Sequence, residues 1–151
     1  METANYEKMI ERSYRIFESG NVDGYDEICA KDIKEHTPDL NIPSDKKGIE
    51  YFKEIMRIYY SAFPNVTFDI KEIFIKGDKA ISYVTVKGKN TGEFNGMPPT
   101  NMEVTLDMCE LFRFNICKIS EHWQIMDNMS FMLQLGILTE QDLQKKMEHL
   151  H

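Results

Sequence analysis

Two carboxylates occupy apolar stripes in adjoining strands that the sequence predicts over residues 104–127. Every second residue of the first strand, counted from Val104, is apolar except Glu110. In the second strand, every second residue counted from Ile119 is apolar except Glu121 and Asp127, which ends the stripe. A carboxylate on a core-facing stripe costs several kcal/mol unless it is paired, hydrogen-bonded or protonated. Because burial raises a carboxyl pKa toward the range that proton transfer needs, we interpret Glu110 and Asp127 as candidate acid/base residues.

A tight turn at residues 115–118 would join these strands and bring both apolar faces to the same side of the sheet. In this register Glu110 lies opposite Trp123, which we expect in the wall of a pocket. His122 then points to the opposite face, where a position at the surface or in a subunit interface is expected.

Both carboxylates also have interpretations that require no catalysis. Asp127 precedes a predicted helix at Asn128 and could cap it by accepting hydrogen bonds from its first N–H groups. Glu110 could form a buried salt bridge, or contact His36 or Tyr14. The residue pattern alone leaves these alternatives open.

The rest of the chain predicts helices first and an antiparallel sheet second. Apolar residues at helical spacing predict one helix that ends at Gly20 and a longer one between Ser44 and Phe63. From Val66 the apolar period changes to two. This order is typical of an α+β domain with helices on one face of a curved sheet, which can leave a cavity between them. We therefore predict a single domain over residues 1–151.

Composition limits the classes of partner and location. The 151 residues include 18 Lys and Arg against 25 Asp and Glu, a formal charge of −7. This balance argues against nucleic acid or an anionic membrane as a main partner. No stretch approaches the roughly 20 apolar residues of a membrane span, and the N-terminal segment resembles an amphipathic helix rather than a signal peptide. Three cysteines without metal-ligand spacing predict neither a zinc site nor a disulfide framework, and suggest a reducing cytoplasm.

Soft and aromatic side chains are abundant, with 10 Met, 9 Phe and 7 Tyr. Such side chains suit an adaptable apolar pocket. A methionine-rich core without any pocket explains the composition equally well.

Several segments together resemble a known family. These are KDIKEHTPDL and SAFPNVTFDI in the first half, then TGEFNGMPPT, VTLDMCELFRF, KISEHWQIMD and MLQLGIL. They are similar to the SnoaL-like polyketide cyclases, or ester cyclases, of the nuclear-transport-factor-2-like superfamily. The resemblance covers roughly residues 6–138 and is most specific over residues 91–127.

The resemblance implies a cone-shaped α+β barrel, a homodimer or larger assembly, and a deep apolar pocket without metal or cofactor. Characterised members close a ring of a polyketide ester by intramolecular aldol chemistry. Asp127 matches their acid/base carboxylate, and His36 matches an early histidine that could donate or orient. Relatives frequently carry His at the positions of Asn90 and Glu110, so the polar groups expected inside this pocket differ.

The resulting hypothesis is cofactor-free acid/base catalysis, a cyclisation or isomerisation, on a small hydrophobic carbonyl compound. Asp127 would be the base, with Glu110 or His36 as proton donor. One alternative is a non-catalytic protein that binds a small apolar ligand, and another is a hydrolase in which Glu110 and Asp127 activate a water. The expected pocket residues are Tyr14, Phe17, Phe52, Met56, Tyr59, Phe94, Met97, Met108, Phe112 and Trp123.

Overall fold

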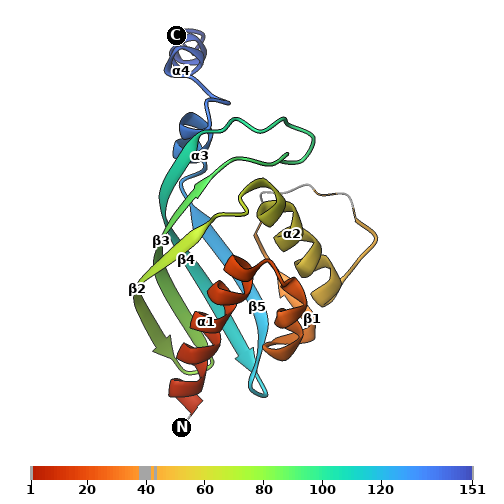
Figure 1. Cartoon of the computed structure of the whole chain (residues 1–151). Coiled ribbons are helices and arrows are strands. Elements are labelled where there is room, and N and C mark those ends of the chain that lie inside the picture. Colours follow the sequence, from red (N-terminus) through yellow and green to blue (C-terminus); the bar gives the residue numbers. More distant parts are fainter. Residues whose placement is uncertain (1, 38–41, 43, 151) are drawn as a thin grey trace.

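The computed structural model describes residues 2–37, 42 and 44–150 and has the predicted α+β architecture (Figure 1). Side-chain placement is described from residue 5 onward. The elements are α1 (Glu2–Ser19), the 3₁₀ helix η1 (Val22–Glu27), β1 (Cys29–Glu35), α2 (Gly48–Ala62), β2 (Thr67–Lys76), β3 (Lys79–Lys89), β4 (Glu103–Asn115), β5 (Lys118–Met126), α3 (Asn128–Gln134) and α4 (Glu140–Glu148).

The five described strands form one sheet in the order β1-β5-β4-β3-β2. β1 runs parallel to β5, whereas the other neighbours are antiparallel. α1 packs along β2 and α2 packs along β1, so both helices lie on the same side of the sheet (Figure 1). α4 extends away from the sheet beyond α3.

Apolar side chains fill the space between the helices and the inner face of the sheet. One cluster includes Ile10 of α1 and Val84 of β3, both fully buried. A second cluster surrounds Phe63, at the end of α2, and Leu135, which follows α3. β4 supplies buried residues to both clusters at every second position, as its sequence predicts.

The turn between β4 and β5 is placed as predicted, but the register beyond it is not. Asn115 pairs with Lys118 and Phe114 with Ile119. The pairing then shifts by one residue at Ser120, whose hydroxyl donates to the Arg113 carbonyl at 3.2 Å. Such a β-bulge moves every later side chain of the strand to the opposite face.

Asn90 fixes the segment between β3 and β4 instead of contributing to a pocket. Its amide nitrogen donates to the Ala62 carbonyl at 3.2 Å and to the Gly92 carbonyl at 2.9 Å. Its amide oxygen accepts from the backbone and hydroxyl of Thr100 at 2.8 and 3.0 Å. Asn90 is 2% exposed and does not line the main cavity, so the expectation that it belongs to the pocket is wrong.

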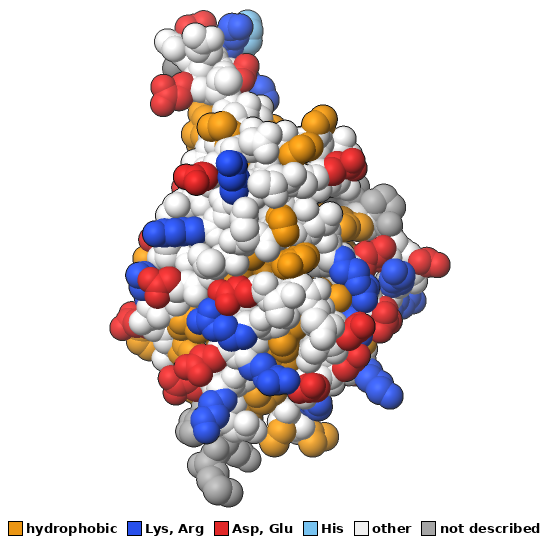
Figure 2. All heavy atoms as spheres, viewed as in Figure 1, with side chains coloured by type: hydrophobic (Ala, Val, Ile, Leu, Met, Phe, Trp, Pro, Cys, Tyr) orange, Lys and Arg blue, Asp and Glu red, His pale blue; other side chains and the backbone are white. Residues whose placement is uncertain are grey.

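The surface visible in Figure 2 carries Lys and Arg intermingled with Asp and Glu, without a large patch of either sign. Among the described helices, none is long and apolar enough to cross a membrane.

The β4–β5 turn stores strain that can be removed. Ile116 and Cys117 have φ values of 46° and 57°, a conformation that favours Gly or Asn. We expect Cys117→Gly to raise the free energy of unfolding by about 1 kcal/mol. A residue with a Cβ costs the folded state roughly that amount when its backbone adopts a positive φ, and glycine has no such cost. Urea denaturation followed by circular dichroism measures the change. Cys117→Ala is the matched control, since it removes the thiol but keeps the Cβ and should gain little.

Candidate functional site

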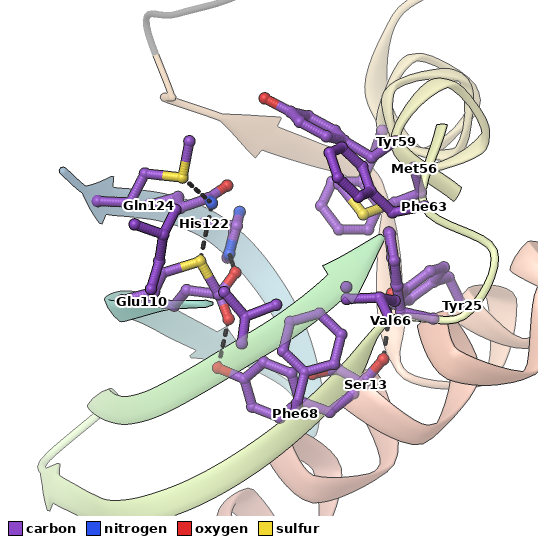
Figure 3. A pocket seen from close by; sticks show the side chains of 18 of the residues that line it. Ser13, Tyr25, Met56, Tyr59, Phe63, Val66, Phe68, Glu110, His122 and Gln124 are labelled. Atoms are coloured by element: carbon purple, nitrogen blue, oxygen red, sulfur yellow. Dashed lines mark hydrogen bonds and ion pairs between the residues drawn. The ribbon is translucent and has the colours of Figure 1, made fainter. Parts of the chain in front are cut away.

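A cavity of about 120 Å³ lies between the inner face of the sheet and the helices (Figure 3). Its wall is mostly aromatic and aliphatic, and residues from α1, α2 and α3 face residues from the sheet. The predicted pocket residues that line it are Tyr14, Phe17, Phe52, Met56, Tyr59, Met108 and Phe112. Glu110 lines it too, as the one carboxylate among the described lining residues.

Glu110 is buried in this wall and is held by donors from two other elements. The imidazole Nε2 of His122, from β5, lies 2.9 Å from Glu110 Oε1. The hydroxyl of Tyr14, from α1, donates to the other carboxylate oxygen. Ser82 Oγ of β3 lies 2.5 Å from the Tyr14 oxygen; because the Tyr14 proton is used on Glu110, Ser82 acts as the donor. Each oxygen of a carboxylate can accept two hydrogen bonds, so these contacts leave acceptor capacity on Glu110.

His122 bridges two carboxylates. Its Nδ1 lies 2.5 Å from Oε2 of Glu35. Glu35 is the last residue of β1 and pairs with His122 in the parallel β1–β5 ladder. Glu35 is also fixed by the backbone and hydroxyl of Thr37, at 2.8 and 2.5 Å. A neutral imidazole has a single N–H, whereas contacts to a carboxylate at both nitrogens fit the doubly protonated imidazolium.

The pKa shifts follow from burial and from these contacts. Burial alone would lower the pKa of His122, but the charge of Glu35 and the hydrogen bonds to Glu110 and Glu35 outweigh it and raise the pKa to about 10. Burial would raise the pKa of Glu35, but the charge and hydrogen bond of His122 and the hydrogen bonds of Thr37 hold it below its ordinary value. Burial and the neighbouring charge of Glu110 raise the pKa of Tyr14 far above its ordinary value, so the phenol keeps its proton.

The inward position of His122 corrects the sequence-based prediction. Because of the bulge at Ser120, Glu110 pairs with Gln124 and Leu111 pairs with Trp123. Trp123 therefore lies on the outer face of the sheet and is not among the cavity-lining residues. The alternation counted from Ile119 assumed an unbroken strand, which is why it assigned the two faces of β5 the wrong way round.

His36 lies with Trp123 on the outer face. Its ring stacks on the indole with a centroid distance of 4.4 Å, and its Nε2 lies 3.0 Å from Glu121. Glu121 also accepts from Arg113 at 3.1 Å. The structure therefore does not bring His36 to the cavity or to Glu110, and of the contacts that the sequence left open for Glu110 it shows those with a cation and with Tyr14 but not the one with His36.

Asp127 lies at the start of α3 and is exposed. Its Oδ1 accepts from the backbone N–H of Ser130 at 2.9 Å, the helix-capping geometry that the sequence allowed as an alternative. It is not among the cavity-lining residues. The structure therefore separates the two carboxylates that the predicted hairpin placed on one wall.

The predicted loop residues lie outside the cavity wall. Phe94 packs behind it, with ring centroids 5.4 Å from Tyr59 and 6.4 Å from Phe131, which both line the cavity. Met97 pairs with Phe94 across a short bridge and is 37% exposed. Neither residue is part of the lining.

Glu35, Ser82, His122 and Gln124 are the polar residues of this region that the sequence did not single out as site residues. Gln124 lies beside Glu110 on the cavity wall. Among the described residues, its side-chain amide nitrogen donates to two sulfur atoms, Met108 Sδ at 2.8 Å and Met126 Sδ at 3.6 Å. Figure 3 shows Gln124, His122 and Glu110 together on one wall, opposite Tyr59, Met56 and Phe63. One signal was available: a buried Glu110 needs a donor, and His122 is the histidine of the adjoining strand.

The charged residues Glu35, His122 and Glu110 lie in a row and do not surround a common centre. Glu35 and Glu110 lie on opposite edges of the His122 imidazole. Within the described part of the chain, no group of three or more His, Cys, Asp and Glu side chains is placed to hold a metal ion. With His122 protonated and both carboxylates ionised, this row carries one net negative charge beside an apolar cavity. A carboxylate on the cavity wall can accept a proton from a bound ligand.

The raised pKa of His122 predicts how stability depends on pH. A pKa that is higher in the folded state gives a contribution that is complete below about pH 6.5, the unfolded value, and is lost as the pH rises toward 10. The lowered pKa of Glu35 gives a contribution that is present above its unfolded value of about 4.3 and is lost as the pH falls through the folded pKa. We expect the free energy of unfolding to be greatest between these limits and to decline from pH 6.5 upward.

Nitrogen-15 NMR of histidine-labelled protein measures the protonation state directly. Both ring nitrogens of His122 should remain protonated at pH 8, where an ordinary histidine is neutral. His36→Gln removes an exposed ring and simplifies the spectrum without changing this signal. A neutral His122 at pH 8 would contradict the assignment.

Comparison with known proteins agrees with the observed architecture. The profile described as SnoaL-like polyketide cyclase matches residues 7–135. A search of curated proteins finds no match. Among solved structures, TsrD from Streptomyces laurentii superposes with a TM-score of 0.79 at 21% identity, over 89% of this chain and 97% of TsrD.

Two further structures share somewhat more sequence. IdmH from Streptomyces antibioticus, provisionally described as a polyketide cyclase, has a TM-score of 0.72 at 28% identity, over 86% of this chain and 97% of its own. AclR from Streptomyces galilaeus, provisionally described as a hydroxylase, has a TM-score of 0.71 at 25% identity, over 91% and 97%. The family profile covers most of the chain and the fold is the same, so this protein belongs to the SnoaL-like polyketide cyclase family.

Proposed function

We propose that this protein catalyses a cofactor-free proton transfer on a small hydrophobic carbonyl compound, with Glu110 as the base. The observation that carries the proposal is the position of Glu110, the one carboxylate among the described residues of an otherwise apolar cavity wall. Family membership supports chemistry of the cyclase type. The two residues that the sequence offered beside Glu110, Asp127 and His36, are directed elsewhere.

The proposed step begins when a carboxylate oxygen of Glu110 removes a proton from a carbon next to a carbonyl. The electron pair of the broken C–H bond becomes an enolate, and Glu110 becomes a neutral acid. In a cyclisation the enolate carbon attacks a second carbonyl carbon of the same molecule, which forms the C–C bond and leaves an alkoxide. Glu110 returns the proton to that oxygen. In an isomerisation Glu110 returns the proton to a different carbon instead.

His122 and Tyr14 have distinct tasks in this proposal. Both hold the Glu110 carboxylate in one orientation, which places its remaining lone pairs toward the cavity. The imidazolium also places a positive charge beside the carboxylate. Glu35 acts through His122, because its charge holds the ring protonated and fixes its orientation.

The two alternatives from the sequence differ in their support. The hydrolase needs Glu110 and Asp127 on one water, and Asp127 instead caps α3 outside the cavity wall. A binding protein without catalysis needs only the cavity, so an activity measurement separates it from the enzyme.

The first test measures hydrogen exchange on a surrogate rather than turnover of an unknown substrate. Phenylacetone carries acidic hydrogens next to a carbonyl, and proton NMR in D₂O follows their loss. We expect the protein to accelerate this exchange above the buffer rate. Glu110→Gln should reduce the protein-dependent rate by about 100-fold or more, because positioned general bases contribute about that much.

Asp127→Asn is the matched control, since an asparagine also caps a helix and leaves the cavity wall intact. Its exchange rate should equal that of the wild type. If Asp127→Asn loses exchange and Glu110→Gln keeps it, Asp127 is the base and our assignment fails. Binding of phenylacetone without accelerated exchange would favour the binding protein.

We also propose that the protein forms a homodimer through the outer face of its sheet. Register places six residues with apolar surface in two adjacent rows there, which we call the outer apolar patch: Ile81, Leu111 and Trp123 in one row, and Tyr83, Cys109 and Ile125 in the other. Ile125 is 72% exposed and Ile81 is 43% exposed. A contiguous apolar patch of this kind marks an interaction surface, and the family resemblance favours a second copy of the chain.

Light scattering coupled to size-exclusion chromatography tests the dimer. We expect about 35 kDa for the wild type, twice the 17.7 kDa of one chain, and the monomer mass for Ile125→Lys, since a lysine on each copy would be buried at a two-fold interface. Ile116→Lys, at the exposed β4–β5 turn, should leave the mass unchanged. A monomeric wild type would overturn this proposal without affecting the role of Glu110.

A further inference from the structure

The side-chain amide of Gln124, on the cavity wall, donates to weak hydrogen-bond acceptors. Its Nε2 contacts the thioether sulfurs of Met108 and Met126, at 2.8 and 3.6 Å. A thioether is a weak acceptor, so these contacts give the half-buried amide no strong acceptor among the described residues. A ligand oxygen in the cavity would therefore be a better partner than either sulfur.

The backbone fixes the direction of this side chain. The Gln124 backbone N–H donates to the Thr37 hydroxyl at 3.1 Å, and Gln124 pairs with Glu110 across the β4–β5 ladder. Side chains of directly paired residues have Cβ atoms about 4.5–5.5 Å apart and stand on the same face. A donor and an acceptor thus lie side by side on one wall of the cavity.

The methionines give the amide freedom to change partner. Both have unbranched side chains with several rotatable bonds, and both line the cavity with Gln124. They can move aside when an oxygen atom approaches the amide, whereas a rigid polar partner would have to be displaced at a cost.

We propose that Gln124 recognises the carbonyl oxygen of the ligand, and that Glu110 beside it restricts the ligand to neutral compounds. The Gln124 Nε2–H donates to the carbonyl oxygen in place of the methionine sulfurs. This assignment rests on the proposed function for its chemistry: an N–H on that oxygen stabilises the enolate that forms when Glu110 removes the neighbouring proton. Recognition of the carbonyl itself is a binding property and can be measured without turnover.

The second half of the proposal, the restriction to neutral ligands, follows from the charge of the wall. Glu35, His122 and Glu110 together carry one net negative charge when both carboxylates are ionised. Tyr14 and Tyr25, the other titratable groups beside Glu110, are neutral phenols with raised pKa values. A ligand carboxylate next to Gln124 would face this net negative charge in a low-dielectric wall, which is strongly unfavourable.

Three compounds of the same shape test the proposal. Acetophenone, cumene and benzoate share a phenyl ring with a branched three-atom group, and differ in carrying a carbonyl, no polar atom or a carboxylate. Compounds with a single ring are used because the cavity, at about 120 Å³, is of the same order as the cavity of about 150 Å³ that admits benzene. Isothermal titration calorimetry gives the affinity of each compound for the protein of 151 residues.

The decisive quantity is the ratio of acetophenone affinity to cumene affinity. We expect Gln124→Met to lower this ratio about 10-fold, the upper range for one hydrogen bond, by weakening acetophenone alone. Met126→Leu is the matched control, because it changes the neighbouring wall but keeps the amide and should leave the ratio nearly unchanged. Wild-type protein should bind benzoate at least 10-fold more weakly than acetophenone, and Glu110→Gln should narrow that gap.

A measurement on the wild type avoids dependence on how well the variants fold. In nitrogen-15 NMR, acetophenone should shift the Gln124 side-chain amide protons downfield, and cumene should not. The proposal is overturned if Gln124→Met weakens both ligands equally, if it weakens neither, if benzoate binds as well as acetophenone, or if acetophenone does not bind at millimolar concentration. Normal carbonyl selectivity without hydrogen exchange on phenylacetone would instead refute the proposed catalysis and leave the role of Gln124 intact.

Discussion

The hydrogen-bonded ion pair between Glu110 and His122 is the interaction on which the rest of the site depends. A carboxylate in an apolar wall is tolerated only with charged or polar donors around it. Glu110 obtains one donor from α1 and one from β5, and His122 in turn requires Glu35 from β1. Segments far apart in the chain are thereby fixed relative to β4. Removal of His122 would leave both carboxylates without their charged partner.

A single extra residue in β5 makes that pair possible and also shapes the opposite face of the sheet. The bulge at Ser120 turns His122, Gln124 and Met126 toward the cavity. The same shift turns Trp123 and Ile125 outward, where they join the outer apolar patch. The catalytic hypothesis and the dimer hypothesis thus depend on one local irregularity. Without it, a histidine and an amide would be on the outer surface, and an indole would stand beside Glu110.

The sequence predicts most of this fold, and its failures have a specific cause. β4 alternates cleanly between apolar and polar residues, so its inner face and the position of Glu110 were predictable, as was the turn after it. β5 has apolar residues mainly at odd positions, Ile119, Trp123 and Ile125, so alternation assigns them to one face and cannot reveal the bulge at Ser120 that turns the last two outward. β1 pairs with β5, which is remote in the sequence, and its register is irregular. The sequence therefore does not show that Glu35 points inward while the next residue, His36, points outward. The need of Glu110 for a donor was a better guide than periodicity.

The residue at position 110 sets the net charge of this arrangement. A histidine there would put two imidazoles next to Glu35, and the chain of charges would be neutral once one of them is protonated. Glutamate at this position makes the same chain negative and places a proton acceptor on the cavity wall. One substitution therefore changes both the basicity of the wall and the charge of ligand that it tolerates. Glu35 contacts Nδ1 of His122 whichever residue occupies position 110, so His122 can remain an imidazolium in either case. The fold of this chain thus supplies a cavity and a cation beside it, and the residue at position 110 determines the charge on the cavity wall.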